Sequence, residues 1–159
     1  MAKAREIPGL AEAASFREAA ARAVEVRAEE VFEHREGVLD LSDVERVHDM
    51  RVATRRLRAA MEIFAECFPK KEHKRLLKEV KELADALGER RDRDVAIEAL
   101  RGVAAELTAT ERPGLKHLQD ELGAEQDHAN GELAAVLDEV DHGGLRERLL
   151  ALAVAARPE

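Results

Sequence analysis

The sequence predicts an all-α fold, an antiparallel bundle of about six helices, and three observations support this prediction. The 159 residues include 29 Ala and 19 Leu but only 16 Val and Ile together, and 3% are aromatic. Ala, Leu, Glu, Arg and Lys lose least on entering a helix, whereas strands favour β-branched and aromatic side chains. Apolar residues also recur at three- and four-residue steps. The length suits one domain, residues 1–159, with a core over about 10–156.

The first two helices are expected over about residues 10–35 and 42–67. The first is rich in Ala and should end at Gly37. The second has a marked start, because Ser42 and Glu45 have the spacing of a capping box, in which two side chains bond to the free amides of the first turn.

The middle of the chain predicts two separate helices. The third should span about residues 71–87 and end at Gly88, which stands where a left-handed C-cap belongs. Either Asp92 or Asp94 can cap a fourth helix, which should continue to about Leu107.

The last part of the chain predicts a long helix and a short one. Pro113 suits the first turn of a fifth helix, which should run to about Val140. Gly143 and Gly144 predict a break before a final helix over about residues 145–155. Because the connections are short, neighbouring helices should be antiparallel.

Composition excludes several classes of protein. The longest uncharged apolar run near the C-terminus, residues 149–156, is far shorter than the ~20 residues that a bilayer requires. The N-terminal residues lack the apolar stretch of a signal peptide. The single cysteine, Cys67, cannot form an internal disulfide, which suits a reducing compartment. We therefore expect a cytoplasmic protein.

Charge is distributed unevenly along the chain, whose net charge is -8. Residues 46–78 contain ten basic and four acidic side chains, a net charge of +6, which leaves -14 for the remainder. This asymmetry predicts an anionic partner for residues 46–78 alone.

Helical geometry places the basic side chains in two rows. At about 100° per residue, one narrow face of the second helix holds four of them, opposite its apolar side, while Arg56 lies apart. That row is His48, Arg51, Arg55 and Arg58. The row on the third helix is Lys71, Lys74, Lys78 and Lys81. We call the two rows together the cationic track.

The residue types of the cationic track suit phosphate. Arginine offers a rigid fork of donors that can take two oxygens, lysine supplies a compact charge, and histidine can donate to a phosphate oxygen. An ordinary solvated helix face is the alternative, but such faces usually alternate Glu and Lys at four-residue steps. A row of one sign predicts a linear polyanion whose binding weakens steeply with salt.

Two stretches resemble a known family. Residues 47–59, with the sequence VHDMRVATRRLRA, followed by Phe64, resemble the signature helix of the CHAD domain, the conserved histidine α-helical domain. Leu87-Gly88 and the stretch RDRDV at residues 91–95 resemble the second motif of that family. The two motifs occur in order and at compatible spacing.

The resemblance implies a non-catalytic helical module that binds inorganic polyphosphate and is often linked to polyphosphate granules. By matched position, the ligand contacts would be His48, Arg51, Arg55, Arg56 and Arg58. Further contacts would be Lys74, Lys78 and Arg91, with the rest of the lysine row flanking them. No catalytic residue, metal or cofactor is expected.

The length departs from the family pattern. The usual domain is about twice this size and consists of two helical bundles related by a pseudo-two-fold axis, but no second copy of the motif follows Val140. The chain is therefore either a half-length member that forms a homodimer or a fragment, and we favour the homodimer. A symmetric dimer would place two His48 helices around one groove.

Three other functions are alternatives. Glu-x-x-His pairs at Glu45/His48, Glu125/His128 and Glu139/His142 are typical of di-metal bundles, but His48 faces away from the apolar stripe. A nucleic-acid binder could use the same cations on phosphates, although the chain has no Trp or Tyr for stacking. A helical protein-interaction scaffold would not need the cations at all.

A nucleophilic enzyme is disfavoured by the side chains that the chain offers. The two serines are Ser15 and Ser42, and Ser42 is expected to cap a helix. Cys67 ends an apolar helix, where a buried structural thiol is expected. No glycine-rich phosphate loop is present in the sequence.

Overall fold

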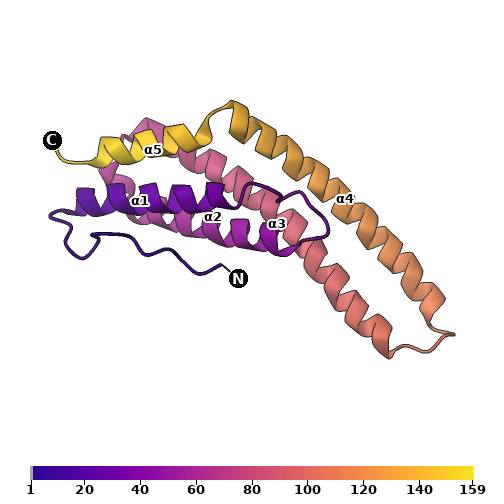
Figure 1. Ribbon diagram of the computed structural model, residues 1–159. Helices are drawn as coiled ribbons and strands as arrows, with labels where there is room; N and C mark the ends of the chain where they lie inside the picture. The colour runs from indigo at the N-terminus through magenta and orange to yellow at the C-terminus, as the bar shows by residue number, and fades with distance from the viewer. Residues whose placement is uncertain (1) are drawn as a thin grey trace.

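The computed structural model describes residues 2–159, which contain five α-helices joined by short connections (Figure 1). They are α1 (Phe16–Glu33), α2 (Glu45–Ile63), α3 (Lys70–Glu106), α4 (Arg112–His142) and α5 (Leu145–Ala156), with a 3-10 turn, η1 (Ala65–Cys67), after α2. No strand occurs among the described residues, so the all-α prediction is confirmed, with one α-helix fewer than expected. Within the same residues, no helix is both long enough and apolar enough to span a bilayer.

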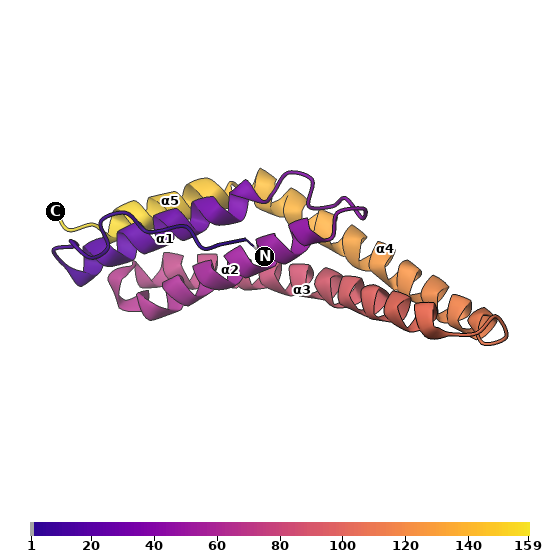
Figure 2. The ribbon, with the colours of Figure 1, turned by 60° about the horizontal axis from the view of Figure 1, so that its bottom comes forward.

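The helices form two regions, which we call the bundle and the arm. In the bundle, α1, α2 and α5 pack with the first part of α3 and the last part of α4 (Figures 1 and 2). The arm comprises residues 95–128, which are the rest of α3, the rest of α4 and the connection between them. It is a two-helix hairpin that extends past the ends of the other helices.

The hydrophobic core lies entirely in the bundle. Each long helix contributes leucines or valines at helical spacing, and Leu57, Leu87 and Leu137 are each at most 1% exposed. Between residues 95 and 128, by contrast, no side chain is buried. Burial of a leucine side chain contributes about 1.5–3 kcal/mol, so the bundle supplies most of the apolar stabilisation.

The predicted break at Gly88 is wrong, because α3 runs without interruption through it. Gly88 lies where the Arg51 guanidinium of α2 crosses α3, 3.5 Å from the position that a Cβ would occupy. Asp94 does not cap a new helix but accepts from Arg90 Nε, one turn earlier, at 2.9 Å. A glycine inside a helix costs about 1 kcal/mol, and the packing on both sides offsets that loss.

Two helix starts also differ from the prediction. The first helix begins at Phe16 rather than near Leu10, and Ser15 caps it by accepting from the Glu18 amide. The expected capping box of the second helix does not form, because Ser42 Oγ donates to Asp40 and α2 begins at Glu45. These competing side-chain contacts are local, and short polar side chains form them readily.

The second helix ends at Ile63, four residues before the expected Cys67, because a 3-10 turn covers Ala65–Cys67. The boundaries around α4 and after α1 are close to those expected. Pro113 lies in the first turn of α4, and Gly144 has a φ of 63°, which separates α4 from α5. Gly37 also adopts positive φ, shortly after α1 ends. The N-terminal residues run beside α1 and α2 (Figures 1 and 2), where the Ala2 amide donates to Asp49 Oδ1 at 2.7 Å.

Candidate functional site

The α2 row of the cationic track lies on the side of the helix that faces away from the core. Met50, Leu57 and Met61 point inward and are at most 1% exposed. The basic side chains on the other side are half-buried or exposed, and Arg58 keeps 43% of its side-chain surface open to solvent. The basic row of α2 therefore lies opposite its apolar side, as the sequence predicts.

The α3 row lies on an exposed face beside it. All four lysines of the row line one shallow hollow of about 470 Å³, together with Arg75 and Leu77. Contacts between the helices run antiparallel, since Arg91 approaches Glu45, Arg51 lies over Gly88, and Lys81 Nζ is 3.7 Å from Glu62 Oε1. The two rows consequently meet where Arg58 and Lys81 flank Glu62, and together they run along one surface of the bundle.

Carboxylates compensate only part of this charge. Glu62 lies between the rows, where it accepts from Arg58 Nε at 3.0 Å and is close to Lys81. Glu82 lies 3.8 Å from Lys78 Nζ, and both side chains are largely exposed. Among residues 2–159, no ion pair within 4.0 Å involves Arg51, Arg55, Lys71 or Lys74. Exposed pairs contribute little, about 0–1 kcal/mol, so an incoming polyanion can displace them.

Glu62 is the residue of this surface that the sequence interpretation missed. The hydrogen bond from Arg58 lowers the pKa of Glu62, and the charge of Lys81 adds to that effect. Glu62 is fourteen residues after His48, close to four helical turns, so the same angular argument places it on the basic face. Its position on the basic face could therefore have been predicted from the sequence, because Glu62 differs from its neighbours on that face only in the sign of its charge.

Two polar atoms without hydrogen-bond partners lie at the Gly88 end of the cationic track. His48 Nδ1 and Arg91 Nη1 are shielded from solvent and have no hydrogen-bond partner among the described residues. Arg91 Nη1 is 4.0 Å from Glu45 Oε1, beyond hydrogen-bonding range. Buried polar atoms are usually hydrogen-bonded, but Arg90 Nη2 and Asp94 Oδ2 in the core also lack a partner, so such atoms do not by themselves mark a ligand site.

Arg56 lies on a different side of α2 from the cationic track. Its guanidinium donates to the Ala2 carbonyl at 3.1 Å and lies 3.7 Å from Glu30 on α1. The structure therefore brings nine of the ten proposed contacts to one side of the bundle and places Arg56 apart, under the N-terminal segment.

The neighbours of Arg91 are not extra cations of the track. Arg90 is fully buried and is bound to Asp94 and Asn130, while Arg93 pairs with Glu89 and Glu125. In a continuous helix, three consecutive side chains point about 100° apart, so they cannot form one cluster.

The Glu-x-x-His pairs do not converge on a di-metal centre. Glu45, His48 and Asp49 form the one group of three potential metal ligands among the described residues, with ligand atoms within 4.8 Å of one another. Asp49 is bound by the Ala2 amide, and Glu45 is 59% exposed. His128 is 80% exposed on α4 and His142 lies at the glycine break, so neither faces the core.

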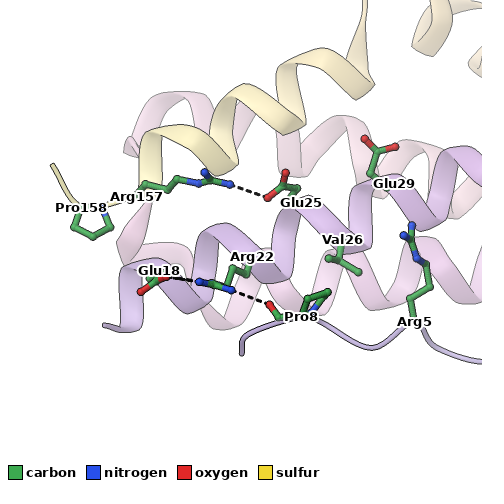
Figure 3. Close-up of a pocket in the computed structure, with 9 residues that line it drawn as sticks. All are labelled: Arg5, Pro8, Glu18, Arg22, Glu25, Val26, Glu29, Arg157 and Pro158. Carbon is green, nitrogen blue, oxygen red and sulfur yellow. Dashed lines mark hydrogen bonds and ion pairs between the residues drawn. The ribbon is translucent and has the colours of Figure 1, made fainter. Parts of the chain in front are cut away.

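Another hollow, of about 740 Å³, lies between the N-terminal segment, α1 and the chain end (Figure 3). Its cations are already engaged, because Arg22 binds Glu18 and the Pro8 carbonyl, and Arg157 binds Glu25. Two of the carboxylates face these cations directly, as the dashed contacts show. This hollow therefore lacks the uncompensated charge of the cationic track.

The candidate nucleophiles are also placed by the structure. Cys67 is buried, and burial raises the pKa of its thiol, which disfavours the reactive thiolate. Ser15 caps α1 and Ser42 is bound to Asp40, as described above.

Comparison with protein families gives one match. The model of the CHAD domain matches residues 22–159, nearly the whole chain, and this match covers both motifs on which the resemblance was based. Comparison with curated proteins and with solved structures gives no match.

Proposed function

This chain belongs to the CHAD domain family, and we propose that it binds inorganic polyphosphate along the cationic track. One observation carries the proposal: two rows of basic side chains on adjacent antiparallel helices face solvent together, and carboxylates offset only part of their charge. The family is linked to polyphosphate, and this surface offers the chemistry that such a ligand needs.

A polymer suits this surface better than a single phosphate. From Lys71 to Arg91, α3 rises about 30 Å, and cations occur along this whole length rather than around one pocket. Arginine forks and flexible lysines can follow successive phosphate groups, whereas a single anion would need convergent donors in a closed site. His48 and Arg91 lie at one end of this surface.

The proposed role is binding without catalysis, in the cytoplasm and in association with polyphosphate granules. A buried cysteine and two serines engaged in local hydrogen bonds support a non-catalytic module. We also propose that two copies associate, which would place two cationic tracks in one particle and raise the effective concentration of binding groups on a long polymer.

The test is a titration of the protein with long-chain polyphosphate at two salt concentrations. Replacement of two uncompensated arginines, Arg51→Ala with Arg55→Ala, should weaken binding about tenfold or more at low salt. It should also lower the slope of log K against log[salt] by about two, because two phosphate contacts are lost.

A matched control removes the same charge elsewhere on the bundle. Arg146→Ala with Arg157→Ala eliminates two exposed ion pairs on and after α5 and should leave polyphosphate affinity within about twofold. Equal affinity for both double variants would contradict the proposal.

Competition separates the alternatives. If duplex DNA of equal phosphate concentration displaced polyphosphate completely, the track would be a general phosphate-backbone binder. If the wild-type protein did not bind either polymer at low salt, the scaffold hypothesis would replace the proposal.

A further inference from the structure

The inner face of the arm is the continuation of the bundle core. Along α3, Leu87, Asp94 and Arg101 follow one another at seven-residue steps, and along α4 Gln119 and Gln126 precede Leu133 in the same way. Seven residues are close to two helical turns, so each series stays on one side of its helix. In the bundle this side is covered by other helices, and in the arm it is not.

A groove follows this uncovered face along the arm. Ile97, Leu100 and Gly123 line a hollow of about 320 Å³, and Ala104, Ala105 and Leu115 line another of about 790 Å³ nearer the tip. The two hollows are neighbours, because Arg101 and Gln119 line both of them. A side chain at Gly123 would meet no atom within 4 Å, so another helix can approach closely there.

The edge of the groove on α4 is self-complementary in charge. Arg112 and Lys116 lie near the tip, and Asp120 and Asp127 lie nearer the bundle. At about 100° per residue, these four side chains fall within about 80° of each other around α4. Among residues 2–159, none of the four has an ion pair within 4.0 Å, although Glu125 and Glu121 of the arm lie close to Arg93 and His117.

We propose that the arm is the surface through which two copies of this chain associate, with their inner faces together and their α4 helices antiparallel. Pairing centred near Gln119 would set Arg112 opposite Asp127 and Lys116 opposite Asp120 of the second copy. The same residues then meet on both sides of a two-fold axis, and four helices enclose the groove.

The size of the arm gives an estimate of how tightly the two copies would bind. Residues 112–128 rise about 25 Å, and two helices side by side are about 20 Å wide, so pairing buries on the order of 1,000 Å² in total. That area is near the lower limit for a specific interface, and the seam is partly polar. We therefore expect a dimer that forms in the micromolar range and depends on protein concentration.

This inference deepens the proposed self-association and does not depend on polyphosphate binding. Sedimentation velocity over about two decades of concentration around the micromolar range should show a monomer–dimer equilibrium for the wild-type chain. One variant carries Arg112→Glu and Lys116→Glu, which makes the edge wholly acidic. The reciprocal variant carries Asp120→Lys and Asp127→Lys, which makes it wholly basic.

Each of these variants alone should lose at least about tenfold in dimer affinity, and an equimolar mixture of the two should recover a heterodimer. The control pair, Glu121→Lys with Glu132→Lys, makes the same charge change on the other side of α4 and should leave dimer affinity within about twofold. Circular dichroism of each variant checks that the helices remain.

Three results would overturn the inference. If both reciprocal variants dimerised as the wild-type chain does, or their mixture failed to associate, the interface would lie elsewhere. If the wild-type chain stayed monomeric throughout, the proposed self-association would itself be wrong. The proposal of polyphosphate binding would not be affected, because the titration tests it separately.

Discussion

The helices α3 and α4 run through both the bundle and the arm, yet only the bundle has a core. In the bundle, α3 and α4 contribute Leu83, Leu87, Leu133 and Leu137, each at most 1% exposed. In the arm, Ile97, Leu100, Leu115 and Leu122 recur at similar steps but stay only half-buried. The difference is that α1, α2 and α5 cover the inner face of one region and end before the other. Coverage by a third layer, more than the hydrophobic pattern itself, decides where a core forms.

The boundary between the two regions is a buried polar joint. Asp94 accepts from Arg90 Nε and from Gln126 Nε2, and Asn130 donates to the Leu39 carbonyl while it accepts from Arg90. This network links α3, α4 and the connection after α1 where the apolar core stops. The hydrogen bonds among these groups offset part of the cost of burying them, while Arg90 Nη2 and Asp94 Oδ2 have no partner among the described residues.

The largest expected effect comes from breaking that joint. Asp94→Ala leaves the Arg90 guanidinium buried without its carboxylate, so it should lower the free energy of unfolding by about 3–5 kcal/mol. Chemical denaturation measures this loss. In the arm, Glu121→Ala removes an exposed partner of His117 and should change stability by less than about 0.5 kcal/mol. Similar losses for the two variants would show that the joint does not differ from the arm surface.

Replacing one leucine by alanine in the bundle and one in the arm compares the packing of the two regions directly. Leu133→Ala, in the bundle, should lower the free energy of unfolding by about 2–5 kcal/mol, because it leaves a cavity. Leu122→Ala, on the same helix in the arm, removes a half-buried side chain and should lower it by about 1 kcal/mol. Both values come from denaturant titration at low protein concentration, where arm-to-arm pairing does not contribute. An equally large loss of unfolding free energy in the arm would mean that α3 and α4 pack against each other there as tightly as in the core.

Glu79 in the bundle should contribute to the pH dependence of stability. The hydrogen bond from Arg148 on α5 lowers the pKa of Glu79 on α3 below its ordinary value of 4.5. The stabilisation is therefore fully present above that value and is lost as pH falls through the lowered pKa. Glu79→Gln should lower the free energy of unfolding at pH 7 by about 1 kcal/mol and flatten its decline below pH ~4.5. The exposed arm variant Glu121→Gln should change neither quantity.

The smallest effect concerns the charged surfaces of the two regions. Glu62→Gln removes the carboxylate between Arg58 and Lys81 and frees both cations, so polyphosphate affinity should rise about threefold, as expected for an exposed pair. Asp120→Asn removes a carboxylate from the arm, where Arg112 and Lys116 also supply cations. We expect no rise there in a titration at protein concentrations below dimer formation. A rise for Asp120→Asn alone would move the binding surface to the arm.

Residue pattern predicted the cationic track well, because helical rotation is a local property. The faces of α2 that hold His48 and Leu57 follow from about 100° per residue, and the structure has both where that angle places them. Glu62 was overlooked on the same face. Arg56 was included among the contacts because of the family motif, although its helical angle placed it apart from the track. The structure confirms the position that the angle predicted.

The ends of helices were less predictable, because several local signals compete there. Ser42 bonds to Asp40 instead of capping α2, and Gly88 continues a helix that it was expected to end. A C-cap at Gly88 would have required positive φ, which that residue does not adopt. The contact with Arg51 and the Arg90–Asp94 pair lie on either side of it and keep α3 continuous.

The sequence by itself determined the helical class, the amphipathic sides of the helices and the sign of the surface on α2 and α3. These features depend on side-chain type and on rotation within one helix, which act over a few residues. Only the tertiary structure decided that α3 passes through Gly88, that the two basic rows are adjacent, and that the arm lacks a cover. Those features depend on which helices meet and where each one ends, and contacts between residues far apart in the chain set both.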